Sequence, residues 1–256
     1  MHKKMEYGLR LKGIKKENDK KNPLITFITV TFNDEDNLKD TIESVIQLKY
    51  SNVEFIIIDG VSKDGTLSVI QEFEDFIDYA ISEKDNGVYD AMNKGIELAS
   101  GYWLNFLNAG DKILYLNKKD LVRNHNTFTN YYFDEEKEKI LRRPLSKLFL
   151  TRNMPCHQSI IYKRDEIVKY SLEHPVIADF EQILRILKKI EKENVKGSSC
   201  FFYKIPGISH EYASSKGSKK IKNLINRNNI IRKELGIFYF LIGWLNSIRI
   251  IFKSIG

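Results

Sequence analysis

The sequence predicts an α/β fold, a mainly parallel sheet flanked by helices, from three observations. Short β-branched runs alternate with segments whose apolar residues recur at helical spacing, which is typical of strands joined by helical crossovers. The 256-residue chain is 42% hydrophobic and 29% charged, so it can bury a sizeable core and has a globular composition. Acidic residues also follow several of the predicted strands, where open α/β sheets place their ligand sites.

Four strand and helix units open the predicted fold. The strands are the apolar runs at residues 24–32, 53–60, 78–82 and 102–107. Helices are predicted between them, over 34–46, 66–73 and 88–99, because each begins at polar turn residues and repeats apolar residues every three or four positions. In the first helix, for example, Leu38, Ile42 and Val45 share one face.

The second half of the chain has a weaker pattern. Residues 118–150 are polar and charged, and no element is assigned to them. Beyond them the sequence predicts a strand over 157–164, a strongly amphipathic helix over 179–193 and a final strand over 200–206.

Carboxylates recur at the predicted junctions between strands and helices. They are Asp59, Asp64, Asp85, Asp111 and Asp179. Any one of them is a common helix cap or turn residue, but five together indicate a site. The chain has no G-x-G-x-x-G after its first strand and no G-x-x-x-x-G-K-[ST]. Acidic groups that face a phosphate ligand then need a divalent cation between them.

Four ordered segments, "ITFITVTFNDEDNL", "IIIDGVSKDGT", "ISEKDNGVYDAMNKGIELASG" and "LNFLNAGD", resemble the bacterial family 2 glycosyltransferases that build O-antigen, capsule or other exopolysaccharide. The resemblance continues through "MPCHQSIIYKR" and "IADFEQILRIL" and covers residues 23–215. It implies a GT-A fold, Rossmann-like. Outside it lie a basic N-terminal tail over 1–22 and a basic, amphipathic helical tail over 216–256, which their charge and apolar pattern predict.

The resemblance also implies how the nucleotide-sugar donor, a UDP-sugar, is bound. The expected donor contacts are Thr31, Phe32, Asn33, Asp59 and Asp85. Lys94, in "MNKG", either approaches the diphosphate or is a solvated helix lysine.

The segment "NAGD" lies where the family carries its Asp-x-Asp metal motif, with Asn108 in place of the first acid. Asp111 is therefore the expected ligand of Mg²⁺ or Mn²⁺, and Asn108 a ribose or water-mediated ligand. One carboxylate suffices for Mg²⁺ when phosphate oxygens and waters complete its coordination. His210, before a Ser- and Gly-rich loop, is a second metal candidate.

Asp179, in "IADFEQ", matches the general base of the family, and direct displacement with one base implies inversion at the anomeric carbon. The base removes the proton of a saccharide or lipid-linked saccharide hydroxyl as it attacks. The alternative for Asp179 is helix capping, with Glu181 as the substitute base. His157 either lines the acceptor cleft or is a hydrogen-bonded structural histidine.

Charge is concentrated at the two ends of the chain. Residues 1–22 hold eight Lys or Arg against three acids, and residues 216–256 hold nine against one. No signal peptide is recognised, and the apolar run at 237–252 is interrupted by Asn246 and Arg249. We therefore expect a cytoplasmic enzyme held at the inner face of the plasma membrane by an interfacial helix, unless that segment packs on the catalytic domain or a second subunit. The oligomeric state is left open.

Two rival functions remain. A sugar nucleotidyltransferase would share the α/β architecture, but it requires a glycine-rich phosphate loop near the first strand, and this chain has none. A nucleic-acid-binding protein would explain the basic ends but not the ordered acidic turns, so no nucleic-acid partner is predicted.

Overall fold

The computed structural model describes most of the 256-residue chain. The described ranges are 4–122, 127–128, 131–134, 139–142, 147–153, 157–174, 176–189, 197–202 and 217–253.

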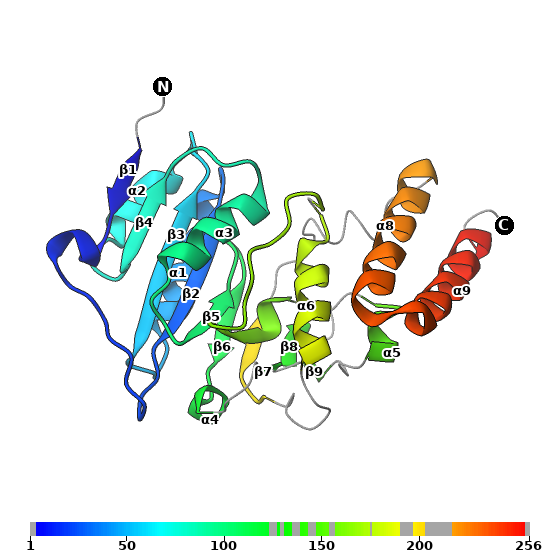
Figure 1. Cartoon of the computed structure of the whole chain (residues 1–256). Helices are drawn as coiled ribbons and strands as arrows, with labels where there is room; N and C mark the ends of the chain where they lie inside the picture. The colour runs from blue at the N-terminus through cyan, green and yellow to red at the C-terminus, as the bar shows by residue number, and fades with distance from the viewer. Residues whose placement is uncertain are drawn as a thin grey trace.

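A seven-stranded sheet forms the centre of the molecule, in the order β1-β4-β3-β2-β5-β10-β7 (Figure 1). Its strands are β1 (Met5–Tyr7), β2 (Ile25–Thr31), β3 (Val53–Asp59), β4 (Tyr79–Ser82), β5 (Trp103–Phe106), β7 (Thr127–Phe128) and β10 (Ile160–Lys163). The four central strands, β4, β3, β2 and β5, are parallel, whereas β1 and β10 pair antiparallel with their neighbours. The predicted strands at 24–32, 53–60, 78–82 and 102–107 are confirmed as the parallel centre.

Helices cover both faces of this sheet. They are α1 (Glu35–Ile46), α2 (Thr66–Glu72), α3 (Val88–Leu98) and α6 (Ala178–Lys189). The side chains of β2 alternate between two cores: Phe27 packs with α1 and α2, whereas Ile28 packs with α3 and α6. On α3, a Cβ at Gly95 would lie 2.3 Å from Cγ2 of Ile28, so the glycine lets this helix approach the sheet closely. Alternate residues of β2 therefore fill the two cores on opposite faces of the sheet.

A second, four-stranded sheet has the order β6-β11-β8-β9. Its strands are β6 (Lys112–Tyr115), β11 (Cys200–Phe202), β8 (Tyr131–Asp134) and β9 (Lys139–Arg142). Strands β8 and β9 lie in the segment 118–150, to which the sequence analysis assigned no element. The same segment also contains the short helices α4 (Lys118–Leu121) and α5 (Lys147–Leu150). The strand predicted over 157–164 begins only at Ile160, because residues 157–159 form a 3-10 turn, η2.

The N-terminal segment, predicted to be a basic tail over residues 1–22, packs on the sheet where the structure describes it. Strand β1 pairs with β4, and the 3-10 helix η1 (Leu9–Lys12) follows. Its cations contact acids of the same chain: Arg10 lies 2.5 Å from Glu54 and Lys16 lies 2.8 Å from Asp78. The tail was predicted because β1 is too short to show a strand pattern, and its partner strand lies more than 70 residues away.

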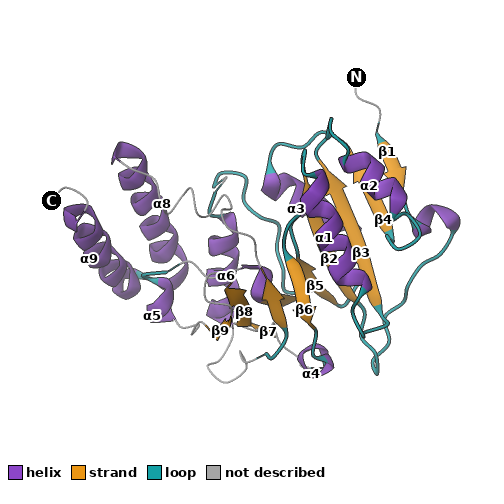
Figure 2. Ribbon diagram, turned by 180° about the vertical axis from the view of Figure 1, so that it is seen from behind, coloured by secondary structure: helices purple, strands orange, loops and turns teal. Residues whose placement is uncertain are grey.

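The C-terminal segment forms two helices, α8 (Gly217–Leu235) and α9 (Ile237–Lys253). Figures 1 and 2 place them at the end of the molecule opposite β1, with α8 beside α6. Buried Ile230 and Ile231 join the core that contains Phe180 of α6. Among the described residues, no helix is long and apolar enough to span a membrane. The helical tail predicted by the sequence is confirmed, and it is packed on the rest of the fold.

Candidate active site

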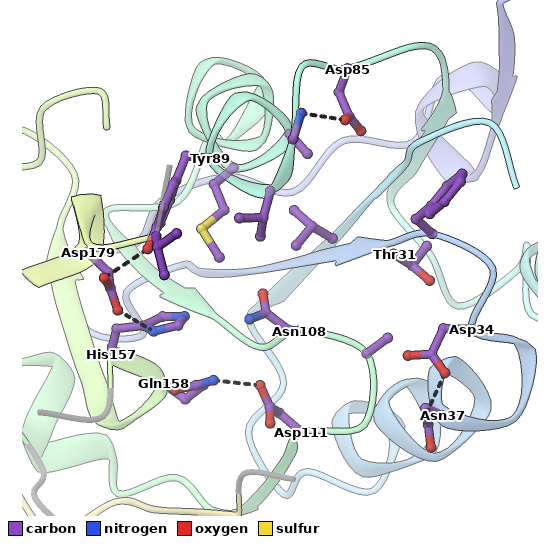
Figure 3. Close-up of a pocket in the computed structure, with 18 residues that line it drawn as sticks. Thr31, Asp34, Asn37, Asp85, Tyr89, Asn108, Asp111, His157, Gln158 and Asp179 are labelled. Carbon is purple, nitrogen blue, oxygen red and sulfur yellow. Dashed lines mark hydrogen bonds and ion pairs between the residues drawn. The ribbon is translucent and has the colours of Figure 1, made fainter. Parts of the chain in front are cut away.

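One pocket of about 540 Å³ opens at the carboxyl edge of the parallel strands (Figure 3). Three parts of the chain line it: the end of β2 and start of α1, the first turns of α3, and the segments that contain Asn108 to Asp111 and His157 to Asp179. Its volume lies in the range of small-molecule sites, and its position is the usual one for ligands of open α/β sheets. Seven of the predicted site residues line the pocket: Thr31, Phe32, Asp85, Asn108, Asp111, His157 and Asp179.

The wall at the end of β2 suits a nucleoside. Phe32 lines the pocket with 61% of its surface exposed, so its ring is available to a base. A Cβ at Gly60 would lie 2.8 Å from Oδ2 of Asp85 and 3.3 Å from Cδ2 of Phe32, so the glycine lets both side chains lie over the end of β3. Oδ1 of Asp85 accepts from the backbone N of Gly87 at 2.9 Å. Oγ1 of Thr31 is buried and has no partner within the described part of the chain.

Three residues predicted to contact the donor do not line this pocket. Asp59 is fully buried and accepts from the hydroxyls of Ser62 and Ser82, so its carboxylate closes the loop after β3. Asn33 adopts a left-handed φ of 49°, and its side-chain oxygen accepts from the backbone of the neighbouring loop. Lys94 lies 2.9 Å from Glu83, as expected of a helix lysine on the surface. Their contacts with a donor remain predictions.

The turn from Asn108 to Asp111 is tight and held to α1. Gly110 has a φ of 90°, and the hydroxyl of Thr41 accepts from the backbone N of Gly110 at 2.9 Å and donates to the carbonyl of Asp111 at 2.8 Å. Asp111 as a residue is 4% exposed, and its Oδ2 accepts from Nε2 of Gln158 at 2.9 Å. Oδ1 of Asn108 is buried without a partner among the described residues. The turn therefore offers a carboxylate and an amide oxygen to the pocket.

These two oxygens fit a hard divalent cation that takes its other ligands from phosphate and water. They do not make an all-protein cage, since the described residues hold no group of three or more His, Cys, Asp or Glu suited to a metal. His210, the second predicted metal ligand, lies outside the described residues.

On the opposite wall, Asp179 lies in the first turn of α6 and is 2% exposed (Figure 3). Oδ1 accepts from the hydroxyl of Tyr89 at 2.8 Å, and Oδ2 lies 3.2 Å from Nδ1 of His157. Burial, and then the adjacent carboxylate, raise the pKa of Tyr89 far above its usual range, so the phenol keeps its proton and donates it.

Helix capping accounts for only part of the contacts that Asp179 makes. Oδ1 accepts from the backbone N of Phe180 at 2.8 Å, but the same carboxylate lines the pocket. Glu181, the predicted substitute base, does not line it. Its Oε1 lies 2.6 Å from Arg185 and 2.8 Å from Lys233, so this side chain joins α6 to α8.

Sequence reasoning assigned no role to Tyr89 or Gln158, although both lie inside segments that carry the family resemblance. Tyr89 follows Val88 at the start of α3, and Gln158 follows His157. Tyr89 donates to Asp179, and Gln158 donates to Asp111. For Gln158 the signal available was its position beside His157; for Tyr89 it was only the segment that carries the resemblance.

This pocket and sheet define a glycosyltransferase of the GT-A fold. The chain belongs to glycosyl transferase family 2, whose family model matches residues 26–127. A PGL/p-HBAD biosynthesis glycosyltransferase of Mycobacterium tuberculosis is 30% identical over 178 residues, which are 64% of this chain and 69% of that protein. TuaG of Bacillus subtilis, named for teichuronic acid biosynthesis, is 36% identical over 93 residues, which are 35% of this chain and 37% of that protein.

Solved structures confirm the fold. The mannosyltransferase PcManGT from Pyrobaculum calidifontis, in complex with GDP-Man and Mn²⁺, has a TM-score of 0.58 at 13% identity, with 81% of this chain and 64% of that chain covered. S. aureus TarS 1-349, in complex with UDP, has a TM-score of 0.55 at 13% identity, with 83% of this chain and 70% of that chain covered.

Proposed function

We propose that this chain is an inverting, metal-dependent glycosyltransferase that moves a sugar from a UDP-sugar to a saccharide or lipid-linked saccharide in cell-surface polysaccharide synthesis. The observation that carries the proposal is that two carboxylates of one pocket, Asp111 and Asp179, lie in separate surroundings. Asp111 belongs to the same turn as the amide oxygen of Asn108, which has no partner among the described residues, and Asp179 lies between a phenol and an imidazole. Asp111 is suited to hold the cation that stabilises the leaving group, and Asp179 is suited to deprotonate the attacking hydroxyl.

For the donor, the support comes from the wall that contains Phe32 and Asp85 and from the solved relatives in fold. TarS binds UDP and UDP-GlcNAc, and PcManGT binds GDP-Man with Mn²⁺. We assign Asn108 and Asp111 of this chain to Mg²⁺ or Mn²⁺. When bound, the cation supplies counter-charge to the departing nucleoside diphosphate.

For the acceptor, Asp179 takes the proton of the hydroxyl as that oxygen forms its bond to the anomeric carbon. Tyr89 and His157 fix the orientation of the carboxylate, which is the condition for efficient proton transfer. Nε2 of His157 is buried and unpartnered among the described residues, and we assign it to a second polar group of the acceptor. A single displacement of this kind inverts the anomeric carbon.

The acceptor class is proposed from the names of the sequence relatives, which belong to glycolipid and teichuronic acid biosynthesis. The nucleic-acid alternative loses part of its support, because Arg10 and Lys16 of the basic N-terminal segment are paired with acids of the chain itself. We place the enzyme in the cytoplasm, where nucleotide sugars are made.

The test is a panel of nucleotide sugars with Mg²⁺ or Mn²⁺, scored by release of nucleoside diphosphate with and without saccharide acceptors. A UDP-sugar should give acceptor-dependent release, and NMR of the product should show inverted anomeric configuration. The Asp179→Asn protein is the matched control for background hydrolysis. Retention of configuration would contradict the inverting mechanism. Turnover only with donors of another nucleotide would contradict the UDP-sugar donor.

A further inference from the structure

Helix α9 has one face buried against α8 and one face exposed. The buried face carries Gly243 and Ser247: a Cβ at Gly243 would lie 2.6 Å from Oδ1 of Asn228, and the side chain of Asn228 donates to the hydroxyl of Ser247 at 2.8 Å. The exposed face repeats at helical spacing on the opposite side. Its members are Ile237, Phe238, Leu241, Trp244, Leu245 and Ile248, each at least 36% exposed.

The two C-terminal helices that carry this apolar face are cationic. Exposed basic residues lie on both C-terminal helices, and they are Lys219, Lys222, Arg232, Lys233 and Arg249. The only acid in α8 and α9 is Glu234, which is 9% exposed and lies 3.4 Å from Arg185 of α6. A second copy of the chain would bring the same positive charge against itself, whereas an anionic lipid surface complements it.

We infer that the exposed face of α9, with the cations around it, docks this protein on an anionic membrane surface without crossing it. Apolar side chains enter the boundary between headgroups and acyl chains, and the lysines and arginines contact the headgroups. Arg227, which sequence reasoning counted among these cations, is 5% exposed and donates to backbone carbonyls of Leu150 and Thr151, so it belongs to the core.

The docked helix is connected to the active site through α8 and α6. Glu181 accepts from Lys233 at 2.8 Å, and the guanidinium of Arg227 lies 5.1 Å from the ring centroid of Phe180. Phe180 is the neighbour of Asp179. A membrane-bound α9 therefore holds the pocket at a fixed position relative to the lipid surface, which suits an acceptor carried on a lipid.

The experiment is flotation of the full-length protein with vesicles of phosphatidylcholine alone or with phosphatidylglycerol added, at low salt and without donor. The wild-type protein should float with the anionic vesicles and not with phosphatidylcholine alone. The Leu241→Glu/Leu245→Glu protein should lose at least about tenfold in partitioning, because two apolar side chains become charged. Leu11→Glu changes a similarly exposed leucine of η1, outside the C-terminal helices, so it is the matched control and should float like the wild type.

A second pair of changes tests the charge. Lys219→Gln/Lys222→Gln should weaken flotation at low salt and reduce its salt dependence. Unfolding midpoints near that of the wild type show that the variants are folded, because all four substituted side chains are exposed.

The inference is overturned if the wild-type protein does not float, or if the Leu241→Glu/Leu245→Glu protein floats equally well. It is also overturned if sedimentation shows a dimer that this double substitution converts to monomers, because the face would then be an interface between copies. None of these outcomes depends on donor turnover, so they do not bear on the proposed transferase activity.

Discussion

Replacing Asp179 by asparagine tests the proposed chemistry most directly. The amide keeps an oxygen that accepts from Tyr89 and from the backbone N of Phe180, so the first turn of α6 retains two contacts. It cannot take a proton from the acceptor, and it loses the contact between the carboxylate oxygen and Nδ1 of His157. The substitution therefore separates the base from the structural function of the same side chain.

The expected magnitudes follow from these contacts. Loss of a general base lowers kcat by about 10²- to 10⁴-fold, which is about 3 to 5 kcal/mol of activation free energy. Loss of one charged contact lowers the free energy of unfolding by about 1 to 3 kcal/mol. Donor affinity should change little, because Thr31 and Asp85 lie across the pocket from Asp179 (Figure 3).

The assay pairs nucleoside diphosphate release at saturating donor and acceptor with donor binding by calorimetry and a thermal unfolding scan. Glu181→Gln is the control: it removes a buried carboxylate two residues away on the same helix, outside the pocket, so it should reduce stability while the folded protein retains its kcat. If Asp179→Asn retains turnover, or if it loses donor binding together with the fold, the assignment of the base is refuted.

Three further changes address other parts of the molecule. Chelation of divalent cations and Asp111→Asn should each remove most nucleoside diphosphate release, and activity that survives both would refute the metal assignment. Gly60→Ala should raise the donor KM more than it lowers kcat, because the added Cβ lies 2.8 Å from Asp85; unchanged donor kinetics would exclude that wall as the nucleoside site. Burial alone would raise the pKa of Glu54, but hydrogen bonds from Ser100, Thr26 and Arg10 outweigh it and lower that pKa below its ordinary 4.5. The stability that Glu54 contributes is therefore present above pH 4.5 and lost as the pH falls through the lower folded value. Urea titrations should show a smaller loss over this window for Glu54→Gln than for the wild type.

The parallel centre of the fold was predictable because its strands are short, apolar and separated by helices with clear periodicity. Two of the strands that were missed, β1 and β6, have partners far away in the sequence. Strand β1 has three residues and pairs with β4, and β6 pairs with β11 more than 80 residues further on. Such strands are held by their neighbours, so their own composition contains little signal.

The candidate site was predictable at the level of segments but less so at the level of side chains. A residue at the end of a parallel strand lies near the pocket. The direction of its side chain, however, depends on which hydrogen bonds the following loop needs. Asp59 turns inward to accept from Ser62 and Ser82, whereas Asp111 reaches the pocket. The Glu181 to Arg185 pair has the i, i+4 spacing of a helix surface pair, but its second cation, Lys233, lies 52 residues away.

The order in which the pocket is encoded has a consequence for biosynthesis of the protein. Its lining begins at Val30 and is completed only by Asp179, whereas the family match ends at residue 127. A nascent chain that has emerged through residue 127 contains Phe32 and Asp111 but neither His157 nor Asp179. Translation therefore supplies the proposed donor wall before the proposed base, and the lining of the pocket stays incomplete until residue 179 has been made.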